Sequence, residues 1–111
     1  MNLYHLFAEN AELTRIRKLP PEECDSFYDE WRAAKAWRFR RQPAGKFLDW
    51  HPANKKLLFT VLSGQFELGA SDGSLALLGP GDACIISDYG KGHTGRVRGG
   101  GPCEILHVEI D

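Results

Sequence analysis

The chain has 111 residues, of which 42% are hydrophobic and 26% are charged, and its formal net charge is −1. This length and composition fit one soluble globular domain with a single core. A nearly neutral chain has no overall basic field for nucleic acid or acidic membranes, and its apolar runs are too short to span a bilayer. We therefore expect neither nucleic acid nor a membrane as a partner.

The N-terminal residues and the cysteines bear on the compartment. Residues 1–10 lack the basic start and the small-residue cleavage site of a signal peptide. The three cysteines, Cys24, Cys84 and Cys103, are odd in number and form no C-x-x-C pair. Reduced, mostly buried thiols are typical of the cytoplasm, and we expect the protein to be cytoplasmic.

The pattern of the first third of the chain predicts an arm or helix that packs on the main fold. Residues 3–8 form a short apolar stretch, and residues 12–18 predict a peripheral strand that ends at two prolines. A helix is then expected over residues 21–36, because apolar residues recur there at three- and four-residue steps. The expected helical face consists of Cys24, Phe27, Tyr28, Trp31 and Ala34.

A half-buried strand is expected over residues 36–41, because Trp37 and Phe39 alternate there with Arg38 and Arg40. We expect the aromatic side chains to face the core. The arginine face then lies on the solvated side of the sheet, and a basic recognition strip is the alternative.

Short strands separated by glycine and proline turns fill the rest of the chain. They are expected at residues 47–50, 57–62, 65–68, 74–78, 83–86, 93–98 and 103–110. This spacing is typical of a sandwich or barrel rather than of a βαβ sheet. We therefore predict an all-β fold, a single antiparallel β-barrel, with an arm or helix at residues 1–36 and the barrel at residues 37–111, as one structural domain overall.

Two of the expected strand–turn units place a histidine close to a strand end. His51 follows the strand at residues 47–50, and His93 follows the loop after the strand at residues 83–86. We predict that both histidines lie at one pocket, with Trp50 as a further lining residue because aromatic side chains are common in small-molecule sites. His107 alternates with Leu106 and Val108, and we expect it to face outward.

Residues 37–111 resemble the small single-domain bacterial members of the cupin superfamily. The resemblance is carried by the segments DWHPA, LSG, SDG, GPGD and GKGH, which occur in this order from Asp49 to His93. It implies a jelly-roll β-barrel. It also implies four metal-ligand positions, which are His51, Ala53, Leu57 and His93 in this sequence.

Only two of these four positions hold a metal-binding side chain. Catalytic metal sites usually have three protein ligands, and the non-haem iron triad adds a carboxylate to two histidines. Asp49 or Asp88 could supply a carboxylate, but neither stands at a ligand position of the family. We therefore expect no cofactor, and a divalent transition metal held by His51 and His93 is the alternative.

Three functions remain open from the sequence. The first is a small-molecule binding protein that uses the barrel interior without a tightly held metal. The second is a metal-dependent enzyme of the dioxygenase or isomerase type, which the resemblance implies, and the third is a non-catalytic assembly module.

A homodimer is expected, because the N-terminal third is rich in aromatic residues, and exposed aromatic side chains are commonly covered by a second copy of the chain.

Overall fold

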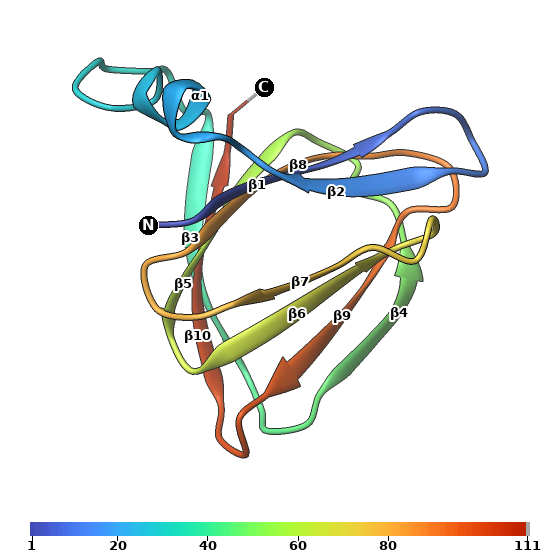
Figure 1. The fold of residues 1–111 in the computed structure, drawn as a ribbon. Coiled ribbons are helices and arrows are strands. Elements are labelled where there is room, and N and C mark those ends of the chain that lie inside the picture. Colours follow the sequence, from blue (N-terminus) through green and yellow to red (C-terminus); the bar gives the residue numbers. More distant parts are fainter. Residues whose placement is uncertain (111) are drawn as a thin grey trace.

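Two β-sheets face each other in the computed structural model, which describes residues 1–110 (Figure 1). The six-stranded sheet has the order β2-β1-β8-β5-β10-β3, and the four-stranded sheet has the order β4-β9-β6-β7. The strands are β1 (Leu3–Ala8), β2 (Thr14–Lys18), β3 (Ala36–Gln42), β4 (Phe47–His51), β5 (Leu57–Ser63), β6 (Gln65–Ala70), β7 (Leu75–Leu78), β8 (Ala83–Ser87), β9 (His93–Arg98) and β10 (Cys103–Glu109). The predicted all-β fold is confirmed.

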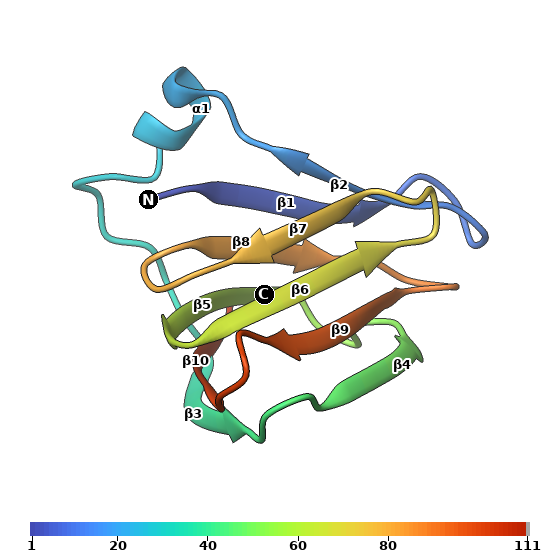
Figure 2. The ribbon, with the colours of Figure 1, turned by 60° about the horizontal axis from the view of Figure 1, so that its bottom comes forward.

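The two sheets keep separate hydrogen-bond ladders over residues 1–110, so they form a jelly-roll sandwich and not a fully closed barrel. Figure 2 shows the four-stranded sheet in front, with β7, β6, β9 and β4 from top to bottom. All neighbouring strands pair antiparallel except β1 and β8, which run parallel. Over the described part of the chain, no helix has the length and hydropathy that a membrane crossing requires.

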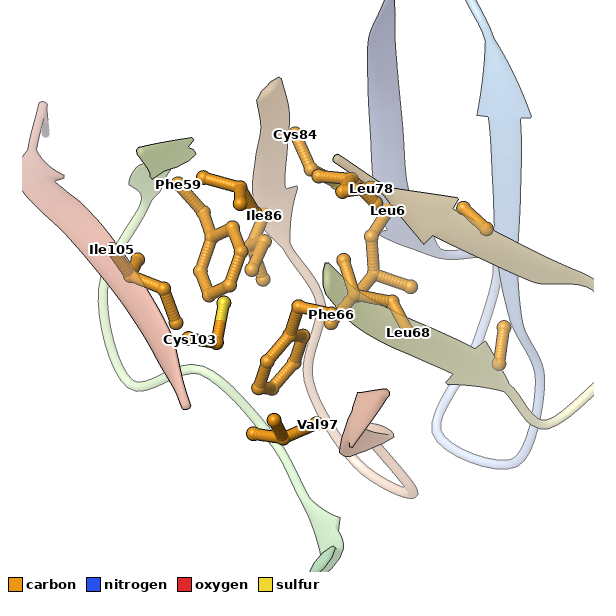
Figure 3. Close-up of a cluster of buried hydrophobic side chains, with 13 residues drawn as sticks. Leu6, Phe59, Phe66, Leu68, Leu78, Cys84, Ile86, Val97, Cys103 and Ile105 are labelled. Carbon is orange, nitrogen blue, oxygen red and sulfur yellow. The ribbon is translucent and has the colours of Figure 1, made fainter. Parts of the chain in front are cut away.

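The core lies between the sheets and takes side chains from both (Figure 3). Phe59 of the six-stranded sheet and Phe66 of the four-stranded sheet lie side by side, with ring centroids 5.1 Å apart. Val61, Leu68 and Ile105 are almost completely buried around them. Burial of each such side chain contributes roughly 1.5–3 kcal/mol to folding, and the two rings join the sheets at the centre of the core.

The N-terminal residues belong to the six-stranded sheet. β1 lies between β2 and β8, and Leu6 of β1 is fully buried in the core. The strand expected over residues 12–18 is present as β2. The first part of the expected arm therefore consists of two sheet strands, and the short apolar stretch at residues 3–8 is one of them.

The helix predicted over residues 21–36 is much shorter than expected. The helix α1 covers only Pro21–Asp25, and residues 26–35 continue as turns and irregular chain. Of the predicted apolar face, Cys24 packs against the buried cluster around Leu19, whereas Trp31 is 102% exposed and Tyr28 is also exposed. A short helix without tertiary packing is marginal in water, which explains why the periodic pattern does not produce a longer helix.

The strand predicted at residues 36–41 is present as β3, but its faces are reversed. Trp37 and Phe39 are each 66% exposed on the outer side of the sheet, whereas Arg38 and Arg40 lie on the inner side and line a cavity. The alternation of side chains along the strand was predicted correctly, but the prediction of which residues face the interior was wrong. The physical reason is that β3 is an edge strand, whose inner face borders an open cavity that accepts charged side chains in place of a dry core.

Candidate functional site

His51 and His93 lie opposite each other on the neighbouring strands β4 and β9. Their ring centroids are 4.5 Å apart. The β4–β9 pairing shifts its register between Leu48 and His51, so the last residue of β4 meets the first residue of β9. The prediction that the two histidines share one end of the fold is confirmed.

Each of the two rings uses its Nδ1 atom for a hydrogen bond to an oxygen. His51 Nδ1 lies 2.7 Å from the backbone carbonyl oxygen of Asp49, and His93 Nδ1 lies 2.6 Å from Oδ2 of Asp88. Carbonyl and carboxylate oxygens accept hydrogen bonds, so the ring Nδ1–H is the donor in both cases. The neutral form of each histidine therefore has a free Nε2 lone pair that can meet a ligand.

Asp88 holds His93 in place from inside the protein. Asp88 and His93 are 4% and 5% exposed, respectively. The second oxygen of Asp88, Oδ1, accepts a hydrogen bond of 3.0 Å from the backbone N–H of Ala53. One carboxylate thus connects the loop before β9 to the chain segment that follows His51.

The loop before β9 passes very close to His51. Gly92 has φ = +76°, and a Cβ atom at this position would collide with the backbone carbonyl of His51. Glycine alone combines this backbone conformation with such a close approach. The glycine therefore allows His93 to enter β9 directly beside His51.

A cavity of about 520 Å³ opens beside the histidine pair. It is bordered by β3 and β4, which are edge strands of different sheets and diverge from the turn at residues 43–46 (Figure 1). Its polar lining residues are Arg38, Arg40, Gln42, Asp49, His51, Asn54, His93 and His107. A cavity of this size, with an apolar floor and several polar groups, is typical of a small-molecule site.

The sequence did not reveal the side of this cavity formed by β3 and β10. His107 was expected to face outward, but it lines the cavity and its ring packs on Phe59 with centroids 5.2 Å apart. Its neighbour across the ladder is Arg38, whose Nε lies 3.4 Å from His107 Nδ1. Cys103, Ile105 and His107 occupy every second position of β10 and therefore share one face of the strand. The two apolar residues, which are buried, were the signal that could have placed His107 on the inner face.

The environment of His107 disfavours its charged form. Burial is the main cause, and the positive charges of Arg38 and Arg40 add to it; together they lower the pKa of His107 from 6.5 to about 4. His107 is therefore neutral at physiological pH. The guanidinium groups of Arg38 and Arg40 carry the positive charge on the side of the cavity formed by β3 and β10.

Trp50 is not among the residues that line the cavity. Its ring is exposed, and the Nζ atom of Lys91 lies 4.9 Å from the ring centroid. Trp50 occupies the irregular part of the β4–β9 pairing, between Leu48 and His51, which turns its side chain away from the cavity. The expectation that Trp50 lines the pocket is therefore not met.

The side chains at the cavity supply few donor atoms for a metal ion. Ala53 and Leu57 line the same cavity as His51 and His93, so all four ligand positions implied by the resemblance converge on it. Two of them carry no donor atom, and Asp88 is committed to His93 and Ala53. Within residues 1–110, no three His, Cys, Asp or Glu side chains are grouped closely enough to share an ion. The residues present do not fit a tightly held metal.

Comparison with known proteins identifies the fold. No family model and no curated protein matches the sequence. Among solved structures, the Cnp3 cupin domain of Schizosaccharomyces pombe is similar with a TM-score of 0.56 and 13% identity, over 93% of this chain and 77% of that chain. A cupin-2 domain protein of Shewanella frigidimarina has a TM-score of 0.52 and 17% identity, over 84% and 94% of the two chains. A protein of Neisseria meningitidis has a TM-score of 0.51 and 14% identity, over 81% and 95%.

Proposed function

Since this chain has the cupin fold, we propose that it is a binding protein that takes a small molecule into the cavity between β3 and β4 without a tightly held metal. The observation that carries the proposal is the His51–His93 pair, whose rings lie 4.5 Å apart at a cavity of about 520 Å³. Hydrogen bonds at Nδ1 orient both rings, and each leaves its Nε2 atom available for a ligand. Fixed polar groups beside an apolar floor give a small-molecule site its specificity.

A fragment screen followed by NMR tests this proposal. The ring signals of His51 and His93 are recorded with a library of neutral and charged fragments, and we expect a subset of fragments to shift both. Ala53→Phe fills the cavity from its lining and should abolish these shifts. Ala44→Phe adds the same ring at an exposed turn and should leave them unchanged. A library without a fragment that shifts these two rings would contradict the proposal.

The second candidate function is a metal-dependent enzyme. It is favoured by one observation, namely that the four ligand positions implied by the family line one cavity. Its weakness is the donor set, because Ala53 and Leu57 supply no ligand atom. The metal content of the purified protein distinguishes the two candidates.

Two further properties belong to the proposal. We place the protein in the cytoplasm, which agrees with the unpaired state of Cys24, Cys84 and Cys103.

We also propose a homodimer in which a second copy covers the outer face of β3 and β10. Trp37 and Phe39 form an edge-to-face pair there, with ring centroids 5.4 Å apart, and the Arg41–Glu104 salt bridge borders them. An aromatic centre with a charged rim is typical of protein interfaces.

A further inference from the structure

Two arginines line the cavity without a carboxylate partner among residues 1–110. Arg38 and Arg40 both come from β3 and project to the same face, and neither forms a salt bridge in this part of the chain. Arg41, the next residue on the strand, faces the other side and pairs with Glu104 at 3.0 Å. β3 thus places its unpaired guanidinium groups on the cavity side only.

The acidic groups near the cavity are engaged elsewhere. Asp88 bonds His93 and the backbone of Ala53, and Glu109 pairs with Lys55 at 3.2 Å. Among residues 1–110, Asp49 is the one carboxylate that lines the cavity, and it accepts a hydrogen bond from the backbone N–H of Trp50. Two guanidinium groups therefore face a cavity to which the described residues contribute a single carboxylate, and this carboxylate stands on β4.

His107 lies on this side of the cavity, and its Nδ1 atom is 3.4 Å from Nε of Arg38. It is the titratable group between the two arginines and the core, and both arginines contribute to the lowering of its pKa. A neutral imidazole offers no negative charge to the guanidinium groups. An anion is the partner that this side of the cavity lacks.

The cavity also has an apolar floor. Leu57, Phe66, Leu68, Ile86 and Ile105 contribute to its lining, and all of them belong to the core cluster or pack against it. A bare inorganic anion would leave this surface unused. A molecule with an anionic head and an apolar body would fill both parts of the cavity.

We propose that the ligand of this cavity is a small carboxylic acid, whose carboxylate binds Arg38 and Arg40 and whose apolar body lies against the core side chains. The planar guanidinium group matches a carboxylate with two parallel hydrogen bonds, which a neutral amide cannot reproduce. This inference rests on the proposed small-molecule function and adds the chemical class of the ligand.

Benzoate and benzamide are the probes, because they share their shape and differ in charge. Binding to the purified protein is measured by NMR titration, together with Arg38→Gln, Arg40→Gln and the matched control Arg41→Gln on the outer face of the same strand. We expect benzoate to bind the parent protein more tightly than benzamide, and to lose about tenfold or more in affinity in Arg38→Gln or Arg40→Gln. The control should bind benzoate as the parent does. Addition of salt to the parent protein should weaken binding of benzoate and leave binding of benzamide unchanged.

The possible results separate this inference from the proposed function. If benzamide binds as tightly as benzoate, the preference for an anion is wrong while the small-molecule site stands. An equal loss of benzoate affinity in the Arg41→Gln control would also overturn it, because the effect would then come from net charge. Inorganic phosphate that binds as tightly as benzoate would overturn the role of the apolar body. If neither benzoate nor benzamide binds, both the inference and the proposed function fail.

Discussion

The carboxylate of Asp88 and the imidazole of His93 form a buried pair, with Oδ2 and Nδ1 2.6 Å apart. The other oxygen of Asp88 accepts a hydrogen bond from the backbone N–H of Ala53, so both oxygens of this carboxylate serve as acceptors. This arrangement determines which ring nitrogen of His93 carries the proton. It therefore also determines what the ring offers to a ligand.

We predict that neutral His93 carries its proton on Nδ1, and that Asp88→Asn moves this proton to Nε2. The introduced asparagine must keep its oxygen toward the N–H of Ala53, so its NH₂ group faces the ring and Nδ1 has to accept. Ring ¹H–¹⁵N correlation spectra distinguish the two tautomers. His51 serves as the internal control, because its Nδ1 bonds a backbone carbonyl that the substitution leaves in place. An Nε2–H tautomer of His93 in the parent protein would contradict the prediction.

Phe59 is predicted to be essential for stability. It is 4% exposed and packs against Phe66 and His107. Phe59→Ala should cost about 3–5 kcal/mol, because it leaves a cavity between the sheets. For a domain of this size, we expect the melting temperature to fall by roughly 10 °C or more. Leu77→Ala on the exposed side of β7 is the control and should melt close to the parent. A Phe59→Ala protein that also melts close to the parent would show that the core is organised differently.

The sequence predicted the fold well, because strand alternation and turn residues are local signals. The strands from β3 to β10 were all expected near their observed positions, as was β2. The parallel pairing of β1 with β8 was not predictable in this way, because it joins segments about 80 residues apart. The helix at residues 21–36 was overpredicted, since periodicity shows an apolar face and does not show whether a surface exists to cover it.

The candidate site was predictable only where the chain carries a motif. His51 ends an expected strand and His93 follows a glycine-rich loop, and the convergence of the two histidines was expected. Arg38 and Arg40 were missed because alternation along a strand does not say which face points inward, and a change of face moves every side chain to the other side. The usual rule that aromatic side chains face the core failed at β3, which borders a cavity.

The stability of the protein should depend on pH through His107. Burial and the two nearby arginines lower the pKa of its folded form from 6.5 to about 4. Between these values the unfolded chain binds a proton that the folded protein excludes, so stability falls as the pH is lowered through this window and is retained above it. The slope from one such group is at most about 1.4 kcal/mol per pH unit, and solvent screening at this half-buried ring reduces it.

Chemical denaturation of the parent protein and His107→Gln at pH 7, 6, 5 and 4 checks this dependence. We expect a flatter profile for the variant. His5, whose pKa is also lowered by burial, is present in both proteins and cancels in the comparison. Parallel profiles for the two proteins would contradict the assignment to His107.

The proposed homodimer predicts a mass of twice 12.4 kDa in light scattering at micromolar concentration. Trp37→Ser combined with Phe39→Ser removes the exposed aromatic pair of β3 and should yield a monomer. Leu75→Ser alters an equally exposed residue on the other sheet and should remain dimeric. A mass of 12.4 kDa for the parent protein would show that the aromatic face stays uncovered in solution and that the dimer is wrong.

The last prediction concerns metal. The parent protein should retain much less than one equivalent of iron, zinc, manganese or nickel after dialysis, because His51 and His93 are two ligands where catalytic sites use three. Ala53→His combined with Leu57→Glu introduces donors at the two remaining cavity positions, and we expect this variant to retain close to one equivalent. Elemental analysis of both proteins, purified and dialysed together, measures the difference. Stoichiometric metal in the parent protein would instead support the metal-dependent enzyme. A variant that remains empty would show that the four positions do not converge closely enough to share an ion.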